Sequence, residues 1–198
     1  MAKKEDRRIR KSRQLIKEAF IDLMHEKGFR GISVYDIADK ADINRGTFYL
    51  HYQDKFDLFE KYVDELLNEL IATIEISNQE KETLNKQKMR ERQPYVEFFK
   101  HFQEHACFYE AMFKYQGDTY FYNRFIDIFK NHFCQEIKKL RIHDDWLKVD
   151  KAFLIHSMVY AHLGSINYWI ENGMSDSAET MGEQLNTLLC AIARVGHD

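Results

Sequence analysis

The stretch from Ser33 to Leu58, SVYDIADKADINRGTFYLHYQDKFDL, decides the fold of this chain. Ser33 and Asp36 have the spacing of a capping box, which predicts the start of a short helix. A polar turn then interrupts that helix, and we expect Asn44 to cap a second short helix through the amide of Thr47. Two short helices joined by so tight a turn predict a helix-turn-helix unit.

The flanks of this stretch also read as helices. Apolar residues recur at helical spacing over residues 15–24, with Ser12 expected as the N-cap and Gly28 as the end of that helix. After the stretch, Asp54 is expected to cap a longer helix whose apolar stripe reaches Ile74.

The remaining two thirds of the chain continue the helical pattern. Residues 77–93 are polar and predict a linker or a frayed helical end, after which Pro94 suits the first turn of a helix. Further helices are expected over residues 95–115, from residue 118, over residues 150–172 and from residue 175. No strand pattern competes, so we predict an all-α protein.

Composition agrees with a helical protein that stays inside the cell. The 198 residues are 44% hydrophobic and include one proline and eight glycines, which favours helices over a loop-rich β protein. Three cysteines without a C-x-x-C pattern indicate reduced thiols rather than a disulfide framework. The uncharged stretch over residues 152–170 carries histidine, serine and asparagine, which favours a buried helix over a membrane span. No secretory leader pattern follows the basic start, and we expect a cytoplasmic location.

Charge is distributed unevenly along the chain. The net charge is −3, yet residues 1–17 hold eight basic side chains against two acidic ones. A basic terminus alone is most often a solvated tail. Next to a helix-turn-helix it becomes a candidate for contact with phosphates.

The helix-turn-helix carries a more specific pattern. The run Ile37-Ala38, Ala41, Arg45-Gly46-Thr47-Phe48-Tyr49, His51-Tyr52, Asp54-Lys55 and Leu58 resembles the DNA-binding domain of the TetR/AcrR family of transcriptional regulators. The resemblance covers residues 10–70 closely and residues 163–189 more loosely.

The resemblance implies a domain organisation and a function. It implies a basic arm at residues 1–9, a three-helix DNA-binding domain at residues 10–70 with the helix-turn-helix at residues 33–52, and a long helix leading into a helical ligand-binding and dimerisation domain at residues 71–198. It further implies a ligand-responsive repressor that binds a palindromic operator as a homodimer, needs no cofactor and is not an enzyme.

The same resemblance assigns roles in DNA binding. Arg45 and Thr47 take positions that read bases, while Tyr35, Tyr49, His51 and Lys55 take positions that hold phosphates. Gly46 either faces DNA or lets the backbone pack closely against the first helix. The full predicted set is Ser33, Tyr35, Arg45, Gly46, Thr47, Tyr49, His51 and Lys55.

An effector pocket is expected in the C-terminal half. Of the 28 aromatic residues, 14 fall between Tyr95 and Phe133, which exceeds what a core needs. By the resemblance, a small molecule bound there changes the spacing of the two DNA-reading heads; its chemistry is unknown. The predicted pocket residues are Phe102, Tyr109, Tyr115, Tyr122, Phe125, Tyr160, His162 and Trp169.

The last two helices are expected to form the dimer interface. Small residues on the first of them allow close approach, and an apolar stripe on the second faces them. In the family these helices pair across a two-fold axis, which also suits two recognition helices about 34 Å apart on DNA. The predicted interface residues are Ser157, Ala161, Gly164, Met181, Leu185, Leu188 and Ile192.

Two other readings stay open for the C-terminal half. His101 and His105 belong to an H-x-x-E-H sequence, but no downstream acidic ligand is evident, so we do not predict a protease. A zinc-responsive regulator is the stronger alternative, since imidazole and thiolate suit zinc and seven candidate ligands of these two types lie there, although satisfied histidines and buried thiols are the commoner explanation. These are His101, His105, Cys107, His132, Cys134, His156 and His162. Control by a partner protein instead predicts a large exposed apolar patch and no closed cavity.

Overall fold

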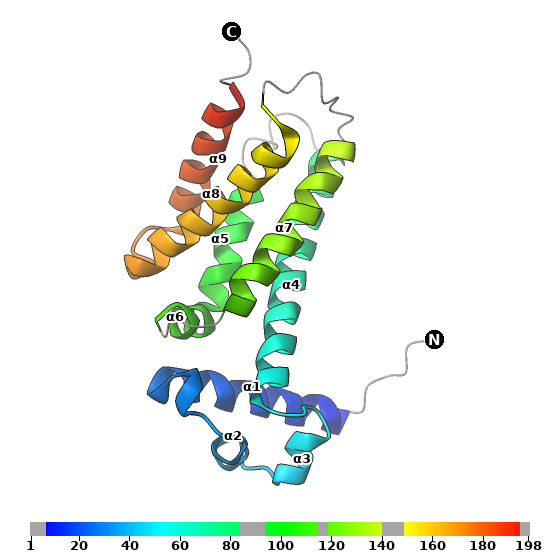
Figure 1. Cartoon of the computed structure of the whole chain (residues 1–198), viewed down its shortest axis with the longest axis vertical. Coiled ribbons are helices and arrows are strands. Elements are labelled where there is room, and N and C mark those ends of the chain that lie inside the picture. The colour runs from blue at the N-terminus through cyan, green and yellow to red at the C-terminus, as the bar shows by residue number, and fades with distance from the viewer. Residues whose placement is uncertain (1–6, 84–93, 115–118, 140–148, 195–198) are drawn as a thin grey trace. The chain divides into compact units, whose positions relative to one another are not determined.

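The structure is a computed structural model that describes residues 7–83, 94–114, 119–139 and 149–194. Within these ranges every regular element is a helix, as predicted (Figure 1). The elements are α1 (Arg7–Lys27), the 3-10 helix η1 (Phe29–Gly31), α2 (Val34–Lys40), α3 (Arg45–Tyr49), α4 (Lys55–Thr83), α5 (Pro94–Glu104), α6 (Ala106–Lys114), α7 (Thr119–Lys139), α8 (Lys151–Glu171) and α9 (Ala178–Arg194).

Packing divides the chain into two compact units. Unit 1 comprises Met1–Glu65 and Ala106–Asp118, and unit 2 comprises Leu66–His105 and Thr119–Asp198. Unit 1 is therefore discontinuous in sequence, because α6 packs on α1. The predicted domain boundaries at residues 9/10 and 70/71 stay predictions, and residues 84–93 of the expected linker lie outside the described residues.

The core of unit 1 is built on the inner face of α1. The side chains of Ile16, Phe20 and Met24 are at most 1% exposed. They share the core with Ile37 of α2 and Phe48 of α3, both fully buried. Burying an aliphatic or aromatic side chain of this size contributes about 1.5–3 kcal/mol, so these contacts hold the short helices on α1.

Caps set the boundaries of the short helices as predicted, with two corrections. The Asn44 side chain does cap α3, but it accepts from the amide of Gly46 at 2.8 Å rather than from Thr47. Ser12 is not an N-cap, because α1 begins at Arg7 and Ser12 lies in its second turn. Its hydroxyl instead donates to the carbonyl oxygen of Ile9 at 2.9 Å, the back-bonding typical of serine inside a helix.

Unit 2 packs α5, α7, α8 and α9 around an aromatic core. Phe125 and Phe129 of α7 stack with centroids 4.1 Å apart. A Cβ placed on Gly182 of α9 would lie 2.8 Å from the backbone nitrogen of Val96, so glycine is what lets α5 and α9 approach. The helix expected over residues 95–115 is broken at His105 into α5 and α6.

The uncharged stretch over residues 152–170 lies in α8, and one face of this helix is buried in the core of unit 2. Among the described residues, no helix has the length and apolar character that crossing a membrane requires. The buried face of α8 consists of Ile155, Val159, His162, Leu163, Ile166 and Trp169.

Candidate nucleic-acid interface

The α2–turn–α3 segment presents one face of α3 outward. Asp42 adopts a positive φ of 50° in the turn, and the amide of Ile43 donates to the carbonyl oxygen of Ala38 at 3.0 Å. Phe48 anchors α3 in the core, so the opposite face of this five-residue helix is exposed. The residues on and beside that face are Arg45, Gly46, Tyr49 and Leu50, the last of them 81% exposed.

Gly46 leaves the start of α3 without a side chain. Among the described residues, the only atom within 4 Å of a Cβ built there, apart from the chain neighbours and the helix's own backbone, is the Oδ1 of Asn44 at 3.3 Å. Close packing against the first helix is therefore wrong as an explanation for this glycine. The bare backbone instead gives an approaching molecule access to the N-terminal end of α3.

Arg45 and Tyr49 lie one turn apart on the exposed face. An Nη of Arg45 lies 3.4 Å from the Tyr49 hydroxyl, and the ring of Tyr49 stands edge-on to Phe48. Tyr35 on α2 is 63% exposed, so three long polar-tipped side chains project from the helix-turn-helix. The structure thus brings these three predicted residues onto the surface of one motif.

A groove runs between the start of α1 and the end of α3. Its volume is about 690 Å³, and the Ser12 hydroxyl lies 2.7 Å from the Nε2 of His51 across it. Arg8 and Lys11 add two cationic side chains to its wall. The groove is lined by Arg8, Ile9, Lys11, Ser12, Leu15, Ile43, Thr47, Leu50 and His51.

The expected basic arm at residues 1–9 overlaps the start of α1. Its last three residues, 7–9, form the first turn of α1, while residues 1–6 lie outside the described residues. Sequence reasoning named Thr47 and His51 and counted Arg8 and Lys11 in the basic terminus that is a candidate for phosphate contact. It did not place the four residues in one groove, because it put the helix start at Ser12.

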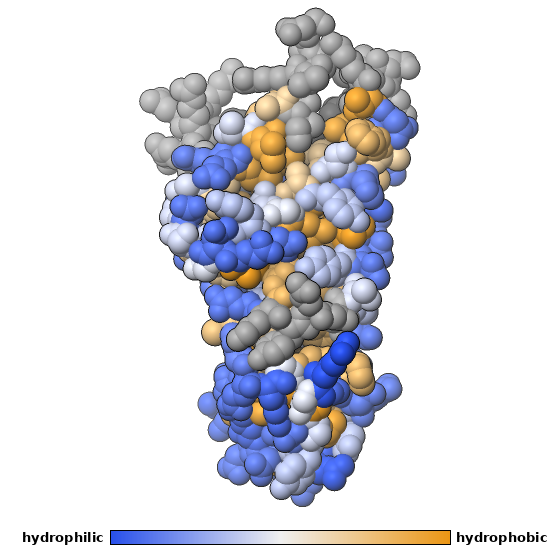
Figure 2. Space-filling view, turned by 60° about the vertical axis from the view of Figure 1, so that its left-hand side comes forward, coloured by the Kyte–Doolittle hydropathy of each residue, from blue (hydrophilic) through white to orange (hydrophobic). Residues whose placement is uncertain are grey.

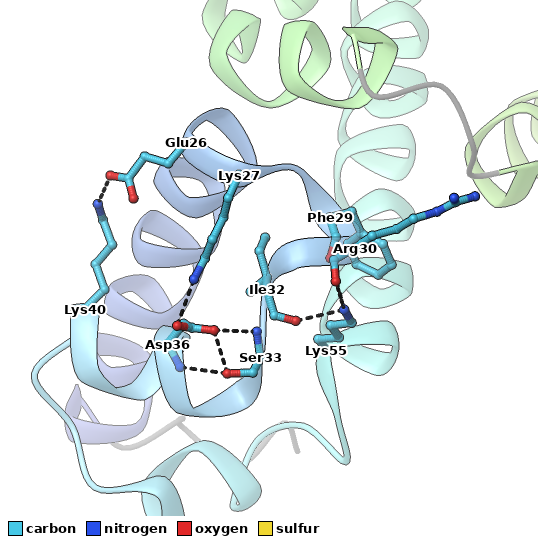
Figure 3. A network of polar contacts seen from close by, with 9 residues as sticks. All are labelled: Glu26, Lys27, Phe29, Arg30, Ile32, Ser33, Asp36, Lys40 and Lys55. Atoms are coloured by element: carbon cyan, nitrogen blue, oxygen red, sulfur yellow. Dashed lines mark hydrogen bonds and ion pairs between the residues drawn. The ribbon is translucent and has the colours of Figure 1, made fainter.

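Lys55 occupies a different setting from the one its predicted role suggests. Its ammonium donates to the backbone carbonyl oxygens of Phe29, Arg30 and Ile32 at 3.0, 3.3 and 2.8 Å (Figure 3). It also lies 4.9 Å from the centroid of the Phe29 ring. In this arrangement Lys55 connects the start of α4 to η1 through hydrogen bonds. Its contact with phosphate stays a prediction.

Ser33 likewise has a structural task. Its hydroxyl accepts from the Asp36 amide at 3.2 Å, and the Asp36 carboxylate accepts from the Ser33 amide at 2.7 Å (Figure 3). Lys27 lies 2.8 Å from the other carboxylate oxygen, and it is the main cause that holds the pKa of Asp36 well below its usual range. The predicted capping box is confirmed, and Lys27 ties it to α1.

Unit 2 contains a separate cavity of about 200 Å³. His162 lies at its wall, fully buried, with its Nδ1 2.7 Å from the Met158 carbonyl oxygen. Burial lowers the pKa of His162 to about 4, so the ring is neutral at physiological pH. The lining residues are Ile74, Tyr95, Phe98, Phe129, His132, Phe133, Glu136, Met158 and His162.

Of the predicted pocket residues, His162 lines this cavity. Phe102, Phe125 and Trp169 are fully buried in the core of unit 2. Tyr109 is fully buried in unit 1, and Tyr122 and Tyr160 are on the surface of unit 2. Tyr115 lies outside the described residues. In the sequence, the aromatic residues that line the cavity are part of the apolar stripes expected of core helices. Such a stripe predicts burial, but it does not predict where packing leaves a cavity.

The predicted dimer residues fall into two groups. Gly164 and Leu188 are exposed and Ser157 and Ala161 are partly exposed, whereas Met181 and Leu185 are buried inside unit 2 itself. The side chain of Ile192 lies outside the described residues.

Sequence reasoning missed an aromatic stripe on the exposed face of α8. Phe153, Tyr160 and Tyr168 are 48–63% exposed, and their spacing places them along one side of the helix with Ser157 and Gly164. Figure 2 shows hydrophobic residues reaching the surface in the upper part of the molecule, among hydrophilic ones.

Histidines and one glutamate gather elsewhere in unit 2. Glu69 of α4, His101 of α5 and His105 have ligand atoms that all lie within 4.8 Å of one another. Burial, with a smaller effect from His105, lowers the pKa of His101 to about 3. Sequence reasoning named both histidines and missed Glu69, which lies 32 residues before His101 in sequence.

Comparison with known protein families gives one match in each half of the chain. Residues 16–62 match the family described as bacterial regulatory proteins, tetR family, and residues 91–190 match a transcriptional regulator C-terminal region of the TetR type.

Two curated relatives are regulators by name. The chain is 25% identical over 170 residues to YxbF of Bacillus subtilis, an uncharacterized HTH-type transcriptional regulator, covering 86% of this chain and 42% of that protein. It is 33% identical over 81 residues to the HTH-type transcriptional regulator AcrR of Shigella flexneri, covering 41% of this chain and 37% of that protein. The chain therefore spans less than half the length of the curated relatives it matches.

Solved structures share the fold. A putative TetR-family transcriptional regulator from Syntrophomonas wolfei superposes with a TM-score of 0.71 at 22% identity, covering 96% of this chain and 97% of that one. The dihydroxyacetone kinase operon activator DhaS superposes with a TM-score of 0.65 at 24% identity, covering 94% of this chain and 98% of that one.

Proposed function

Since this chain belongs to the TetR/AcrR family of transcriptional regulators, we propose that it is a ligand-responsive repressor that binds a palindromic operator as a homodimer. The observation that carries the proposal is the bare N-terminal end of α3, where Gly46 adds no side chain between exposed Arg45 and half-buried Thr47. Base edges in a major groove about 12 Å wide are reached by such a short, open helix end.

Each polar residue around α3 takes a role in this proposal. Arg45 and Thr47 read bases, since a guanidinium pairs with the acceptors of guanine and a hydroxyl serves either kind of base. Tyr35, Tyr49 and His51 hold phosphates. Arg8 and Lys11 join them, because they share the groove that Thr47 and His51 line.

Dimerisation and effector binding belong to unit 2 in the proposal. The exposed aromatic stripe of α8, together with Leu188 of α9, supports a two-fold interface between copies of the chain. The cavity of about 200 Å³ supports a small effector that is mostly apolar, with a polar group placed toward His132 or His162. The cavity also favours a small molecule over a partner protein as the regulating signal.

Effector binding would act by shifting populations. An effector lowers operator affinity only if it binds better to a form in which the two recognition helices are wrongly spaced for DNA. DhaS is named an operon activator, so the shared fold leaves the direction of regulation to experiment. We place the protein in the cytoplasm, with its DNA, and expect no catalytic activity from it.

The test is fluorescence anisotropy of the purified protein on the DNA upstream of its own gene, with a scrambled duplex as the control, at two salt concentrations. We expect tight binding to the native duplex alone. Equal, strongly salt-dependent binding to both duplexes would reflect phosphate attraction only and would contradict local, sequence-specific regulation.

A metal-responsive regulator is the second candidate function. It is favoured by one observation, the grouping of Glu69, His101 and His105 in unit 2. Zinc added to the anisotropy assay separates the two candidates, because only a metal-responsive regulator changes its operator affinity with zinc alone.

A further inference from the structure

We propose that Glu69, His101 and His105 form a binding site for a late first-row divalent cation, with Zn²⁺ the best match, between α4 and the end of α5. The inference concerns the metal site alone and does not depend on the proposed DNA binding.

The two histidines are placed on one side of α5 by its last turn. The amide of His105 donates to the carbonyl oxygen of His101 at 3.2 Å, so the helical hydrogen-bond pattern continues through His105. The centroids of the two imidazole rings are 4.8 Å apart. Histidines spaced by four on a helix can offer their nitrogens to one ion.

Glu69 supplies the acidic ligand that the H-x-x-E-H sequence lacks downstream. Its Oε1 lies 3.8 Å from the Nε2 of His105. This separation is too long for a hydrogen bond, which requires about 2.7–3.2 Å. It is close to the separation of about 3.4 Å between two ligands that each lie about 2.05 Å from a tetrahedral zinc ion.

The Nε2 atom of His105 gives an independent sign that a ligand is missing. It is enclosed by the protein and has no hydrogen-bond partner among the described residues. A buried ring nitrogen without a partner costs free energy, and a bound cation would satisfy it.

The site needs only small movements to close around an ion. The farthest ligand atoms are at most 4.8 Å apart, so they must approach by about 1.4 Å to reach tetrahedral spacing. Glu69 is free to move toward the histidines, because its side chain is 53% exposed, whereas His101 is only 3% exposed and is held in the core.

The ligand set selects the class of cation. Two imidazoles and one carboxylate suit Zn²⁺, Co²⁺ and Ni²⁺, whereas Mg²⁺ and Ca²⁺ require oxygen ligands. Three protein ligands also leave a fourth position, which in zinc proteins of this kind holds water or an exogenous donor.

The test is a calorimetric titration of ZnCl₂ into the full chain, prepared without a histidine tag and stripped with a chelator. We expect one Zn²⁺ per chain, unaffected by an excess of Mg²⁺. Glu69→Gln should weaken zinc binding about tenfold or more, since even a lost neighbour of a zinc ligand costs 10–100-fold in affinity. Because Glu69 lies on the surface, this variant should fold normally.

Matched controls and a second measurement complete the test. Glu183→Gln on α9 and His156→Gln on α8 change exposed residues of the same types and should leave zinc binding unchanged. Zinc should raise the melting temperature of the wild type and of both controls, but much less that of Glu69→Gln. Equal zinc affinity in the wild type and Glu69→Gln, or no uptake by the wild type, would overturn the site. Operator binding measured on the same samples reports separately on the proposed DNA-binding function.

Discussion

In the proposed DNA interface, Gly46 is the position where we expect the lack of a side chain to matter most. Packing within the part of the chain that the structure describes does not explain this glycine, since there only the Asn44 side chain would come within 4 Å of a Cβ at this position, apart from the chain neighbours and the helix's own backbone. A methyl group there would project from the end of α3 that we assign to base reading.

Gly46→Ala should separate stability from DNA binding. Alanine favours a helix by up to about 1 kcal/mol, partly offset by a small shift of the Asn44 cap, so the melting temperature should change little. Crowding at the interface costs about 1–3 kcal/mol, which corresponds to a loss of about 5- to 150-fold in operator affinity. Melting curves and anisotropy check both expectations. Gly31→Ala, whose added Cβ would make ordinary contacts, is the control; equal operator affinity in the two variants would contradict the role.

Substitutions of Arg45 and of Arg8 should affect DNA binding in different ways. Arg45→Ala should relax base preference at one position of the operator, at a cost of about 1–3 kcal/mol. Arg8→Ala, in the groove wall, should weaken all sequences alike and reduce the salt slope by about 1. Anisotropy on the operator and on single-base variants at several salt concentrations distinguishes them. Identical behaviour of the two variants would contradict the assignment of base and phosphate contacts.

We expect substitution of Lys55 to lower the free energy of unfolding, whether or not Lys55 also contacts DNA. Lys55→Met keeps the apolar stem but removes the hydrogen bonds that the ammonium donates to the carbonyl oxygens of Phe29, Arg30 and Ile32, which should cost about 1–3 kcal/mol. Lys61→Met removes an exposed ion pair with Asp57 and should cost about 0.5 kcal/mol or less. Chemical denaturation of both variants provides the comparison. Equal stability of the two would show that the carbonyl contacts contribute nothing.

At the scale of helices, the sequence predicts where a helix begins when a single side chain caps it. The boundaries of α2, α3, α4 and α8 follow from Ser33, Asn44, Asp54 and Asp150, each of which accepts a backbone amide at the start of its helix. The sequence pattern failed at α1, where Ser12 bonds within the helix, and at the α5–α6 break, which no glycine or proline marks.

The buried histidine of α8 should make unit 2 sensitive to mild acid. The pKa of His162 is about 4 in the folded protein, below its ordinary value of 6.5, so only the unfolded chain takes a proton between these values. Its stabilising effect is therefore complete above pH 6.5 and is lost as the pH falls toward 4, by up to about 1.4 kcal/mol per pH unit. His132 and Glu136 are two further ionisable groups on the cavity wall that His162 lines.

Denaturation of His162→Phe from pH 7 to pH 4 tests this expectation. The variant should lose stability with falling pH less steeply than the wild type. His156→Phe, on the exposed side of the same helix, should keep the wild-type slope. An unchanged slope in His162→Phe would mean that this ring does not control the acid response.

For the whole molecule, the sequence predicts the fold class but not the long-range groupings. Helical stripes and caps are local, so an all-α chain with an N-terminal helix-turn-helix could be predicted from them. The packing of α6 on α1, the void beside His162 and the approach of Glu69 to His105 depend on contacts between distant segments. A single sequence carries no local signal for such contacts.

If the proposed dimer forms through α8 and α9, it should be sensitive to a charge placed in its apolar surface. Leu188→Glu places a carboxylate at an exposed apolar position, where it would be desolvated between two copies. We expect the variant to be monomeric by analytical ultracentrifugation and to bind operator at least about tenfold more weakly, since each half-site then binds alone. Gln184→Glu, exposed on the same helix, should remain a dimer. If the Leu188→Glu variant is still a dimer, the interface does not include this position, and the proposed interface is wrong.

Selection of bound sequences from a library of random duplexes tests the central claim, sequence-specific binding by a symmetric dimer, most directly. We predict that the wild-type protein enriches an inverted repeat whose half-site centres lie about one helical turn of DNA, or a multiple of it, apart. Gly46→Ala should enrich it far less. A library that stays unenriched, or a selected motif without two-fold symmetry, would contradict the account.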